Sequence, residues 1–449
     1  MFGSIDWCDT YVGNTARINI GDNFQFLALE YIYQTLGLES SLKKISLKDL
    51  RTYKGECLVV PLNWGLFDAN WMENDNIAIS CDIKPLFLSV TLGSHRNDQY
   101  FNSHNIEYLR SNGPIGCRDE VTFRKLQEYN IPCYLNGCLT LTTPSSVSSG
   151  KFVYFIDVPL SLADKIPDTL LSNARFVSHQ VYYSKDADPK TIVQNIKKQY
   201  DEYRKNAKLI VTSRLHAVAP CIGMGIPVIF TKEIIDDRFS WLDKIVPLYS
   251  LSDWNSINWH PTPIDADFIK SKMLKCAQER ILGRDSSKLQ NEITNFWLER
   301  PKRSYENFRT LLYENFDPIF QWLDASWQRD NNQIYSIWGV TIGADKLIRL
   351  IHEKYPSAKL CKIIDTYRTE KFHEFNITKP SDLVLADNEK LIVLANGASP
   401  QARDFIQSGR INPFDCFLLS DNFITSKEDL LRQRTYVQRQ GRGYTDING

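Results

Sequence analysis

Ser213, Arg214 and His216 stand close together, directly after the apolar run Leu209–Val211. Arginine presents a planar fork that matches a carboxylate or a phosphate, and histidine is the side chain whose charge changes near neutral pH. Serine is a good N-cap, and the first turn of a helix offers unpaired backbone N–H groups to an anion. These residue types at this spacing therefore predict a site that binds an anion and moves a proton.

The elements around this site read as strand, helix and strand. Leu209–Val211 is typical of a strand buried on both faces, which belongs to a parallel sheet covered by helices. Ligands of such sheets collect at the carboxyl ends of the strands. Pro220 leaves the start of the helix open: a helix capped by Ser213 would kink at the proline, whereas one starting nearer Ala217 would leave the arginine and histidine in extended chain. Either geometry can direct both side chains to one ligand.

Three other segments carry candidate residues. Gly21 and Asp22 open an amphipathic helix, where the glycine lets backbone approach a ligand closely and the aspartate either orients a hydroxyl or caps the helix. The guanidinium of Arg118 could clamp an anionic group, unless Asp119 pairs with it. His104 is a second candidate for proton transfer, although a histidine in a loop is more often a surface residue.

Three segments follow one another along the chain: Asn19–Gln25, Pro114–Thr122 continuing to Gly137–Leu141, and Ser213–His216 followed by Gly225–Phe230. In their residues and their order they resemble the polysaccharide pyruvyl transferase family. The resemblance implies two Rossmann-like halves that face a cleft, as in glycosyltransferase-B folds. It also implies transfer of a pyruvyl group from phosphoenolpyruvate to a sugar hydroxyl of a surface glycan or its precursor, with no tightly bound cofactor.

That chemistry assigns expected roles to the candidate residues. Ketal formation from phosphoenolpyruvate needs an acid for the methylene carbon and clamps for the anionic groups. The expected acid or base is His216, with His104 as the second candidate. The expected substrate-binding residues are Arg214, Ser213, Arg118, Gly21 and Asp22.

Length and composition predict several α/β domains. The 449 residues exceed one ordinary core, and 43% hydrophobic with 24% charged residues is typical of a globular protein. Alternating strands and helices favour an α/β class. We expect Rossmann-like halves at residues 1–146 and 147–330, the second with a helical extension. A third, smaller Rossmann-like domain is expected at 331–424, followed by a polar tail at 425–449.

Gly339, Gly343 and Asp365 give the third domain part of a dinucleotide-binding pattern, with a strand before the glycines and a second strand ending at the acid. The spacing is G-x-x-x-G, and the pattern lacks a glycine. Docking or dimerisation is therefore favoured over a bound nucleotide.

Charge and cysteine content indicate which partners and which cellular compartment to expect. Lys plus Arg and Asp plus Glu both number 53, so no basic excess favours nucleic acid. The ten cysteines show no metal-binding spacing and indicate a reducing cytoplasm. No signal peptide or membrane-spanning run is visible, so contact with a lipid-linked acceptor would be peripheral. A homo-oligomer is left open.

Two other functions stay open at this point. A glycosyltransferase of the B type would bind a nucleotide-sugar in the same cleft, and a nucleoside diphosphate would then stabilise it. A non-catalytic carbohydrate-binding or scaffold protein would bind glycan equally well without Arg118, Arg214 and His216.

Overall fold

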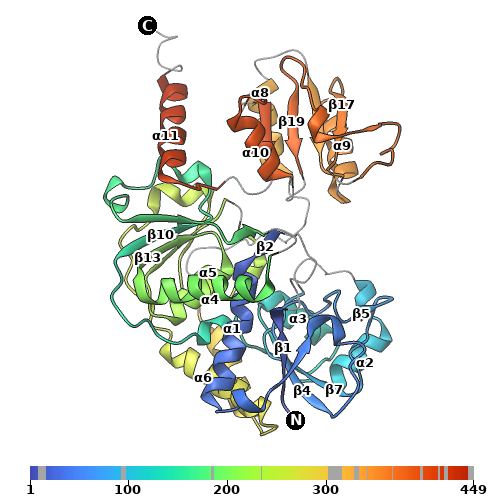
Figure 1. The fold of residues 1–449 in the computed structure, drawn as a ribbon, viewed down its shortest axis with the longest axis vertical. Coiled ribbons are helices and arrows are strands. Elements are labelled where there is room, and N and C mark those ends of the chain that lie inside the picture. Colours follow the sequence, from blue (N-terminus) through green and yellow to red (C-terminus); the bar gives the residue numbers. More distant parts are fainter. Residues whose placement is uncertain are drawn as a thin grey trace. The chain divides into compact units, whose positions relative to one another are not determined.

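The computed structural model describes residues 1–8, 17–92, 98–183, 187–233, 235–301, 316–327, 333–340, 342–366, 368–394, 398–412, 415–418 and 423–442. The chain forms two compact units, Met1–Leu311 with Ile424–Gly449, and Leu312–Phe423. Both units contain parallel sheets and helices, which confirms the α/β class (Figure 1).

Among its described residues, the first half of the larger unit has six strands that run parallel. They are β1 (Gly3–Asp6), β3 (Lys43–Ser46), β4 (Leu58–Leu62), β7 (Ile83–Phe87), β8 (Ile115–Cys117) and β9 (Cys133–Leu135). The pairs β1–β3, β4–β7 and β8–β9 are connected by parallel bridges from Phe2 to Val59 and from Val90 to Cys117. The resulting order, β3-β1-β4-β7-β8-β9, reverses direction between β1 and β4, as in a doubly wound fold. The helices of this half are α1 (Ile20–Thr35), α2 (Ser103–Ser111) and α3 (Glu120–Glu128), and a short hairpin is formed by β5 (Met72–Glu73) and β6 (Asn76–Ile77).

The second half contains a five-stranded parallel sheet of order β11-β10-β13-β14-β15. Its strands are β10 (Phe152–Ile156), β11 (Ala174–Val177), β13 (Ala207–Thr212), β14 (Val228–Thr231) and β15 (Leu248–Tyr249). Its helices are α4 (Pro189–Asn206) and α5 (Leu215–Gly223). The next two helices, α6 (Asp267–Ile281) and α7 (Ser287–Glu299), which we expected as an extension of this half, contact α1 and β9 of the first half instead. The strand order reverses between β10 and β13, which is where a doubly wound sheet binds its ligand.

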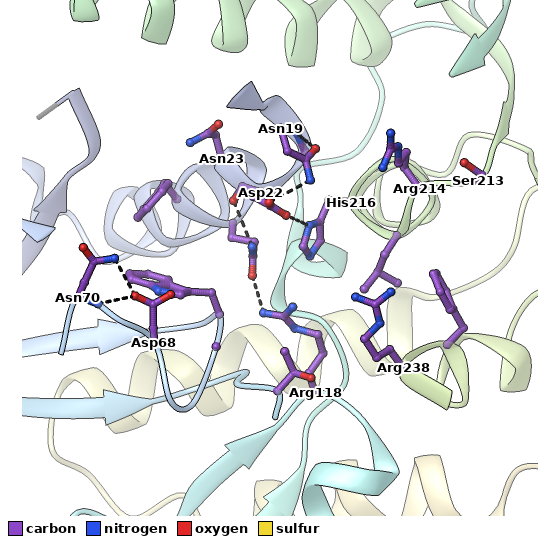
Figure 2. A pocket seen from close by; sticks show the side chains of 18 of the residues that line it. Asn19, Asp22, Asn23, Asp68, Asn70, Arg118, Ser213, Arg214, His216 and Arg238 are labelled. Carbon is purple, nitrogen blue, oxygen red and sulfur yellow. Dashed lines mark hydrogen bonds and ion pairs between the residues drawn. The ribbon is translucent and has the colours of Figure 1, made fainter. Parts of the chain in front are cut away.

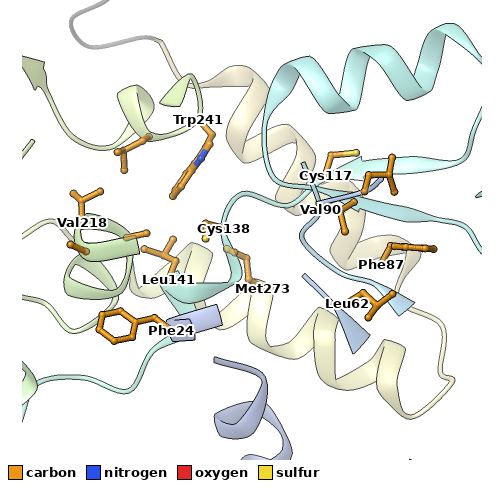
Figure 3. Packing of buried hydrophobic residues seen from close by; sticks show 14 of the residues in the cluster. Phe24, Leu62, Phe87, Val90, Cys117, Cys138, Leu141, Val218, Trp241 and Met273 are labelled. Carbon is orange, nitrogen blue, oxygen red and sulfur yellow. The ribbon is translucent and has the colours of Figure 1, made fainter. Parts of the chain in front are cut away.

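The two halves are held together by shared structure. Strand β2 (Arg17–Asn19) of the first half pairs antiparallel with β12 (Gln180–Tyr182) of the second. One buried cluster includes Phe24 on α1, Val218 on α5 and Met273 on α6 (Figure 3). Because apolar side chains of both halves fill one core, the cavity between their sheets has defined walls.

The smaller unit has a parallel sheet of order β18-β17-β16-β19-β20. Its strands are β16 (Ile334–Trp338), β17 (Lys359–Ile364), β18 (Ile377–Thr378), β19 (Lys390–Val393) and β20 (Cys416–Leu418), and its helices are α8 (Asp317–Trp327), α9 (Ile342–Lys354) and α10 (Ser399–Gln407). Helix α8, which we expected in the second half, packs here instead, because Leu323 and Trp327 join Tyr335 in this unit's core.

The expected polar tail at 425–449 is wrong for its first part. Residues Lys427–Arg442 form helix α11, which belongs to the larger unit. Ile424 and Leu430 are buried in a cluster with Val158, and Arg434 Nε donates to the Ala163 carbonyl at 2.7 Å. The helix was missed because only a few apolar positions anchor an otherwise polar sequence. The smaller unit is therefore inserted in sequence within the larger one.

In the part of the chain that the structure describes, no helix has the length and apolar character needed to cross a membrane.

Candidate active site

Ser213 and Arg214 lie at the carboxyl end of β13, beside Asp157 at the end of β10. Arg214 occupies the N-cap position of α5, so of the two helix starts that the sequence left open, the one capped by Ser213 is excluded. The Ser213 hydroxyl donates to the Asp157 carbonyl at 2.6 Å, and Arg214 Nε donates to the Asp157 carboxylate at 2.8 Å. Asp157 is 1% exposed, whereas the Arg214 side chain is 22% exposed. A buried carboxylate thus holds a partly exposed guanidinium at the point where the strand order reverses.

Pro220 bends the start of α5. It has no N–H for the carbonyl of His216 four residues earlier, and its ring displaces that carbonyl. His216 accordingly has non-helical backbone angles, φ −84° and ψ 15°. The kink explains how a buried helix turns the His216 side chain toward the start of α1.

His216 and Asp22 form a hydrogen-bonded pair across the two halves. His216 Nδ1 lies 3.0 Å from Asp22 Oδ1 (Figure 2). Burial lowers the pKa of His216, but hydrogen bonds with Asp22 and Cys138 outweigh it and leave that pKa raised. Desolvation raises the pKa of Asp22, but the bond with His216 and the charge of Arg118 outweigh it and leave that pKa lowered. The pair therefore favours an imidazolium and a carboxylate, and Asp22 is the more exposed member, at 59% against 10%.

Gly21 lets the first turn of α1 lie against two histidines. A Cβ on Gly21 would lie 3.0 Å from His179 Nδ1 and 3.2 Å from His216 Cβ. The expected close approach at this glycine is therefore made to protein side chains.

Gly21→Ala is expected to lengthen the bond between Asp22 and His216, because α1 must move away to accommodate the methyl group. The pKa of His216 should then fall, and kcat/KM should fall about tenfold or more, since small misplacements of reacting groups are costly. A histidine titration by NMR measures the first effect. An unchanged His216 pKa in a folded variant would contradict this account of the glycine.

His179, which our sequence reasoning missed, supports the site through buried contacts with Asp157 and Tyr203. It is fully buried, its backbone N–H donates to Asp157 Oδ2 at 3.0 Å, and its Nε2 lies 3.0 Å from the Tyr203 hydroxyl. Burial lowers the pKa of His179 to about 4. Its imidazole is therefore neutral at pH 7, unlike that of His216.

The low pKa of His179 makes folding sensitive to acid. The unfolded histidine titrates near pH 6.5 and the folded one near 4, so between these values the unfolded state binds the extra proton. As the pH falls through this window, His179 should therefore lower the free energy of unfolding by about 1.4 kcal/mol per pH unit. Urea unfolding at pH 7 and pH 5 should show a smaller difference for His179→Gln than for the natural protein. The exposed His104→Gln should match the natural protein, and equal slopes in all three would refute the prediction.

Arg118 is a buried cation at the other side of the cavity. One of its terminal nitrogens, Nη2, donates to Gln25 Oε1 and to the carbonyls of Asn63 and Ser89. Asp119 does not pair with it, since that carboxylate accepts from the Thr122 backbone N–H at 2.8 Å and caps α3. Among the described residues, no carboxylate lies within ion-pair distance of Arg118. A buried charge without a counter-ion favours an anionic ligand.

These groups line one cavity of about 510 Å³ between the carboxyl ends of the two sheets. From the first half, its walls include Gly21, Asp22, Asn23, Gln25, Phe26, Trp64, Gly65, Asp68, Asn70, Thr91 and Arg118; from the second, they include Ser213, Arg214, Leu215, His216, Lys232, Arg238 and Phe239. The structure thus brings together every expected substrate-binding residue of the larger unit.

Lys232 and Arg238 are two cations of this cavity that the sequence analysis missed. Lys232 follows β14 at the same sheet edge as Arg214, so the carboxyl-end rule could have identified it. Burial lowers its pKa, Asp236 opposes that effect, and the charges of Arg238 and Arg214 add to it. Arg238 is held by two bonds to Asp236, at 2.8 and 3.0 Å. The second half therefore presents three cations to the cavity.

His104 is not brought to this cavity. It lies on α2, where its Nε2 is 3.1 Å from the Ile77 carbonyl, and its side chain is exposed. The expected role as second acid or base is therefore wrong, because α2 packs against the β5–β6 hairpin.

In the smaller unit, Gly339 follows β16 with a φ of 113°, and Gly343 lies within α9. Asp365 follows β17 and accepts hydrogen bonds from the backbone N–H groups of Val340 and Arg368, at 3.0 and 2.9 Å. The acid thus supports its own loop. Among the described residues, no group of His, Cys, Asp and Glu is arranged to hold a metal.

The fold and the cavity define an α/β protein with an acid–base pair and several cations between two doubly wound sheets. Residues 19–231, which run from the start of α1 to the end of β14, match the polysaccharide pyruvyl transferase family. Over that segment, which is somewhat less than half of the chain, the protein is similar to this family of transferases. No curated protein and no solved structure matches the chain.

Proposed function

We propose that this transferase moves the pyruvyl group of phosphoenolpyruvate to a sugar of a surface glycan or its precursor, in a cleft of the glycosyltransferase-B kind. The observation that carries the proposal is the Asp22–His216 pair, which lies in one cavity with four cations. The reaction needs both a proton donor and clamps for two anionic groups.

The donor's phosphate and carboxylate would bind the cationic walls. Arg214, Lys232 and Arg238 offer charged donors on the second-half side, and Arg118 offers one on the first-half side. Hydrogen bonds between ionised groups are about twice as strong as neutral ones. Cations on two walls suit a ligand that carries two separate anionic groups.

The Asp22–His216 pair would supply the proton. Protonation of the methylene carbon of phosphoenolpyruvate creates an oxocarbenium-like centre at the neighbouring carbon. A sugar hydroxyl forms a bond to that carbon, phosphate leaves with cleavage of its C–O bond, and a second hydroxyl of the same sugar closes the ketal. Of the two hydroxyl protons released, one restores the acid and the other leaves with the phosphate.

The ten cysteines are all free thiols, which supports placing the reaction in a reducing compartment such as the cytoplasm. No tightly bound cofactor is needed, and a lipid-linked acceptor would be met at the membrane surface without insertion.

Calorimetric titration with phosphoenolpyruvate, uridine diphosphate, guanosine diphosphate and cytidine monophosphate tests the donor. Binding of phosphoenolpyruvate alone, followed by release of inorganic phosphate when a sugar acceptor is added, is the expected result. Binding of a nucleotide without phosphoenolpyruvate would instead identify a glycosyltransferase on the same scaffold. Binding of glycan alone, unchanged when Arg118, Arg214 and His216 are all replaced, would identify a non-catalytic protein.

Asp22→Asn should shift the pH dependence of kcat/KM. The natural enzyme requires protonated His216, so its activity should fall as the pH rises through the raised pKa of that residue. Removing the carboxylate removes a cause of that elevation, so the alkaline limb should move to lower pH. Asp201→Asn is the matched control, because it removes a half-exposed carboxylate of α4, and it should leave the alkaline limb in place. An alkaline limb that stays fixed in Asp22→Asn would show that another group sets it.

A further inference from the structure

The cavity has two chemically different ends. Figure 2 shows Ser213, Arg214 and Arg238 on one side, Asp68 and Asn70 on the other, and His216 with Asp22 between them. The end formed by Trp64, Asp68 and Asn70, which follows β4, we call the β4 arm. A donor held by the cations would leave the β4 arm open to the second substrate.

The β4 arm carries a fixed aromatic surface. Trp64 is half-buried, and its ring lies 5.2 Å from that of Phe26 and 5.3 Å from that of the fully buried Trp71. Two aromatic neighbours hold the indole in place, so little conformational entropy is lost when a ligand packs on it. The C–H face of a sugar ring is a suitable apolar partner for such a surface.

The β4 arm also carries an oriented carboxylate. Asp68 Oδ1 accepts hydrogen bonds from the backbone N–H of Asn70 at 2.9 Å and from its side-chain amide at 2.7 Å. Its other oxygen, Oδ2, receives no hydrogen bond or ion pair from any described residue. A Cβ built on Gly65 would be 3.8 Å from that oxygen, so glycine leaves space beside it. The bonds to one oxygen thus fix the orientation of the Asp68 carboxylate, and the other oxygen is available to a ligand.

We propose that the β4 arm is the acceptor subsite and that it selects a neutral sugar, which stacks on Trp64 and donates hydroxyl hydrogen bonds to Asp68. This inference rests on the proposed function. A carboxylate without a counter-ion accepts hydroxyl groups well and repels a second carboxylate. A uronic acid or a phosphorylated sugar is therefore rejected at this end, although the cations at the other end would attract it.

The test uses the whole chain and two probes, methyl galactoside and methyl glucuronide, each titrated in the presence of phosphoenolpyruvate and followed by ligand-observed NMR. The galactoside is expected to bind and the glucuronide to bind more weakly. Asp68→Asn keeps the shape of the side chain and should weaken galactoside binding by about tenfold to a hundredfold, the range for losing a hydrogen bond to a charged group. Trp64→Ala should weaken it about tenfold or more.

Two matched variants serve as controls. Asp201→Asn removes a carboxylate elsewhere whose side chain is 51% exposed, and Trp259→Ala removes a half-buried tryptophan from a different cavity. Both variants should bind the galactoside as the natural protein does. Equal galactoside binding by Asp68→Asn and the natural protein, stronger binding of the glucuronide, or no galactoside binding at all would overturn the inference. Phosphoenolpyruvate binding is measured separately by calorimetry on every variant. If it is absent from the natural protein the proposed function fails, and if it is present while the sugar results fail, only the acceptor subsite is wrong.

Discussion

His216→Ala is expected to lower kcat/KM for pyruvyl transfer by about 10²–10⁴-fold, the range that general acid–base catalysis contributes. Phosphoenolpyruvate should still bind, because the cations on both walls are unchanged. The fold should also persist, since the Asp22 carboxylate is 59% exposed and water can solvate it once its partner is gone. Initial rates of phosphate release and calorimetric binding measure the two effects separately.

His104→Ala is the matched control for this experiment. It removes a histidine that bonds the Ile77 carbonyl outside the cavity, and the rate should be unchanged. A His216→Ala enzyme that keeps full activity would remove the Asp22–His216 pair from the mechanism. A variant that loses phosphoenolpyruvate binding in parallel with its rate would make His216 a binding residue.

Arg214→Ala is expected to weaken phosphoenolpyruvate binding and to destabilise the larger unit. A hydrogen bond to a charged group contributes about 1.5–3 kcal/mol, so losing the guanidinium should weaken binding at least tenfold. Removing it also leaves the Asp157 carboxylate, which is 1% exposed, without its ion-pair partner. Breaking a buried pair in this way costs about 3–5 kcal/mol.

Because the two effects coincide, a second variant separates them. Arg214→Lys keeps a positive charge near Asp157 and loses the planar fork, so it should retain more stability than Arg214→Ala while still binding phosphoenolpyruvate weakly. Arg175→Ala removes an arginine whose side chain is 44% exposed and paired with Glu202, and it should leave both binding and stability nearly unchanged. Tight binding by Arg214→Ala, once its fold is verified by circular dichroism, would exclude Arg214 from the donor site.

The sequence predicted the parts of the site that depend on local rules. An apolar strand followed by polar residues identified Ser213, Arg214 and His216, because the carboxyl ends of parallel strands are where such sheets bind ligands. Gly21, Asp22 and Arg118 were found through the resemblance, and all three line the same cavity.

Residues that depend on tertiary contacts were missed or assigned differently. His179 is positioned by pairing of β12 with β2, and the sequence gives no sign of that long-range contact. Ser213 does not cap α5 because the Asp157 carbonyl, distant in sequence, accepts its hydroxyl. Asp22 pairs with His216 from 194 residues away, so the two were expected to have separate roles. His104 was assigned wrongly for the converse reason. It lies near Arg118 in the sequence, but the fold does not bring it to the cavity.

The return of the chain to the larger unit at Ile424 has a consequence for biosynthesis. The Ile424 backbone N–H bonds the Val158 carbonyl at 2.9 Å, and Leu430 completes the same apolar cluster. During synthesis, the apolar surface of the larger unit that Ile424 and Leu430 cover must therefore stay exposed while residues 312–423 are made. Domains usually fold as units in the order of synthesis, and here the inserted unit can finish before its host. A protein ended at residue 311 would expose that apolar cluster permanently, because Ile424 and Leu430 would be missing from it.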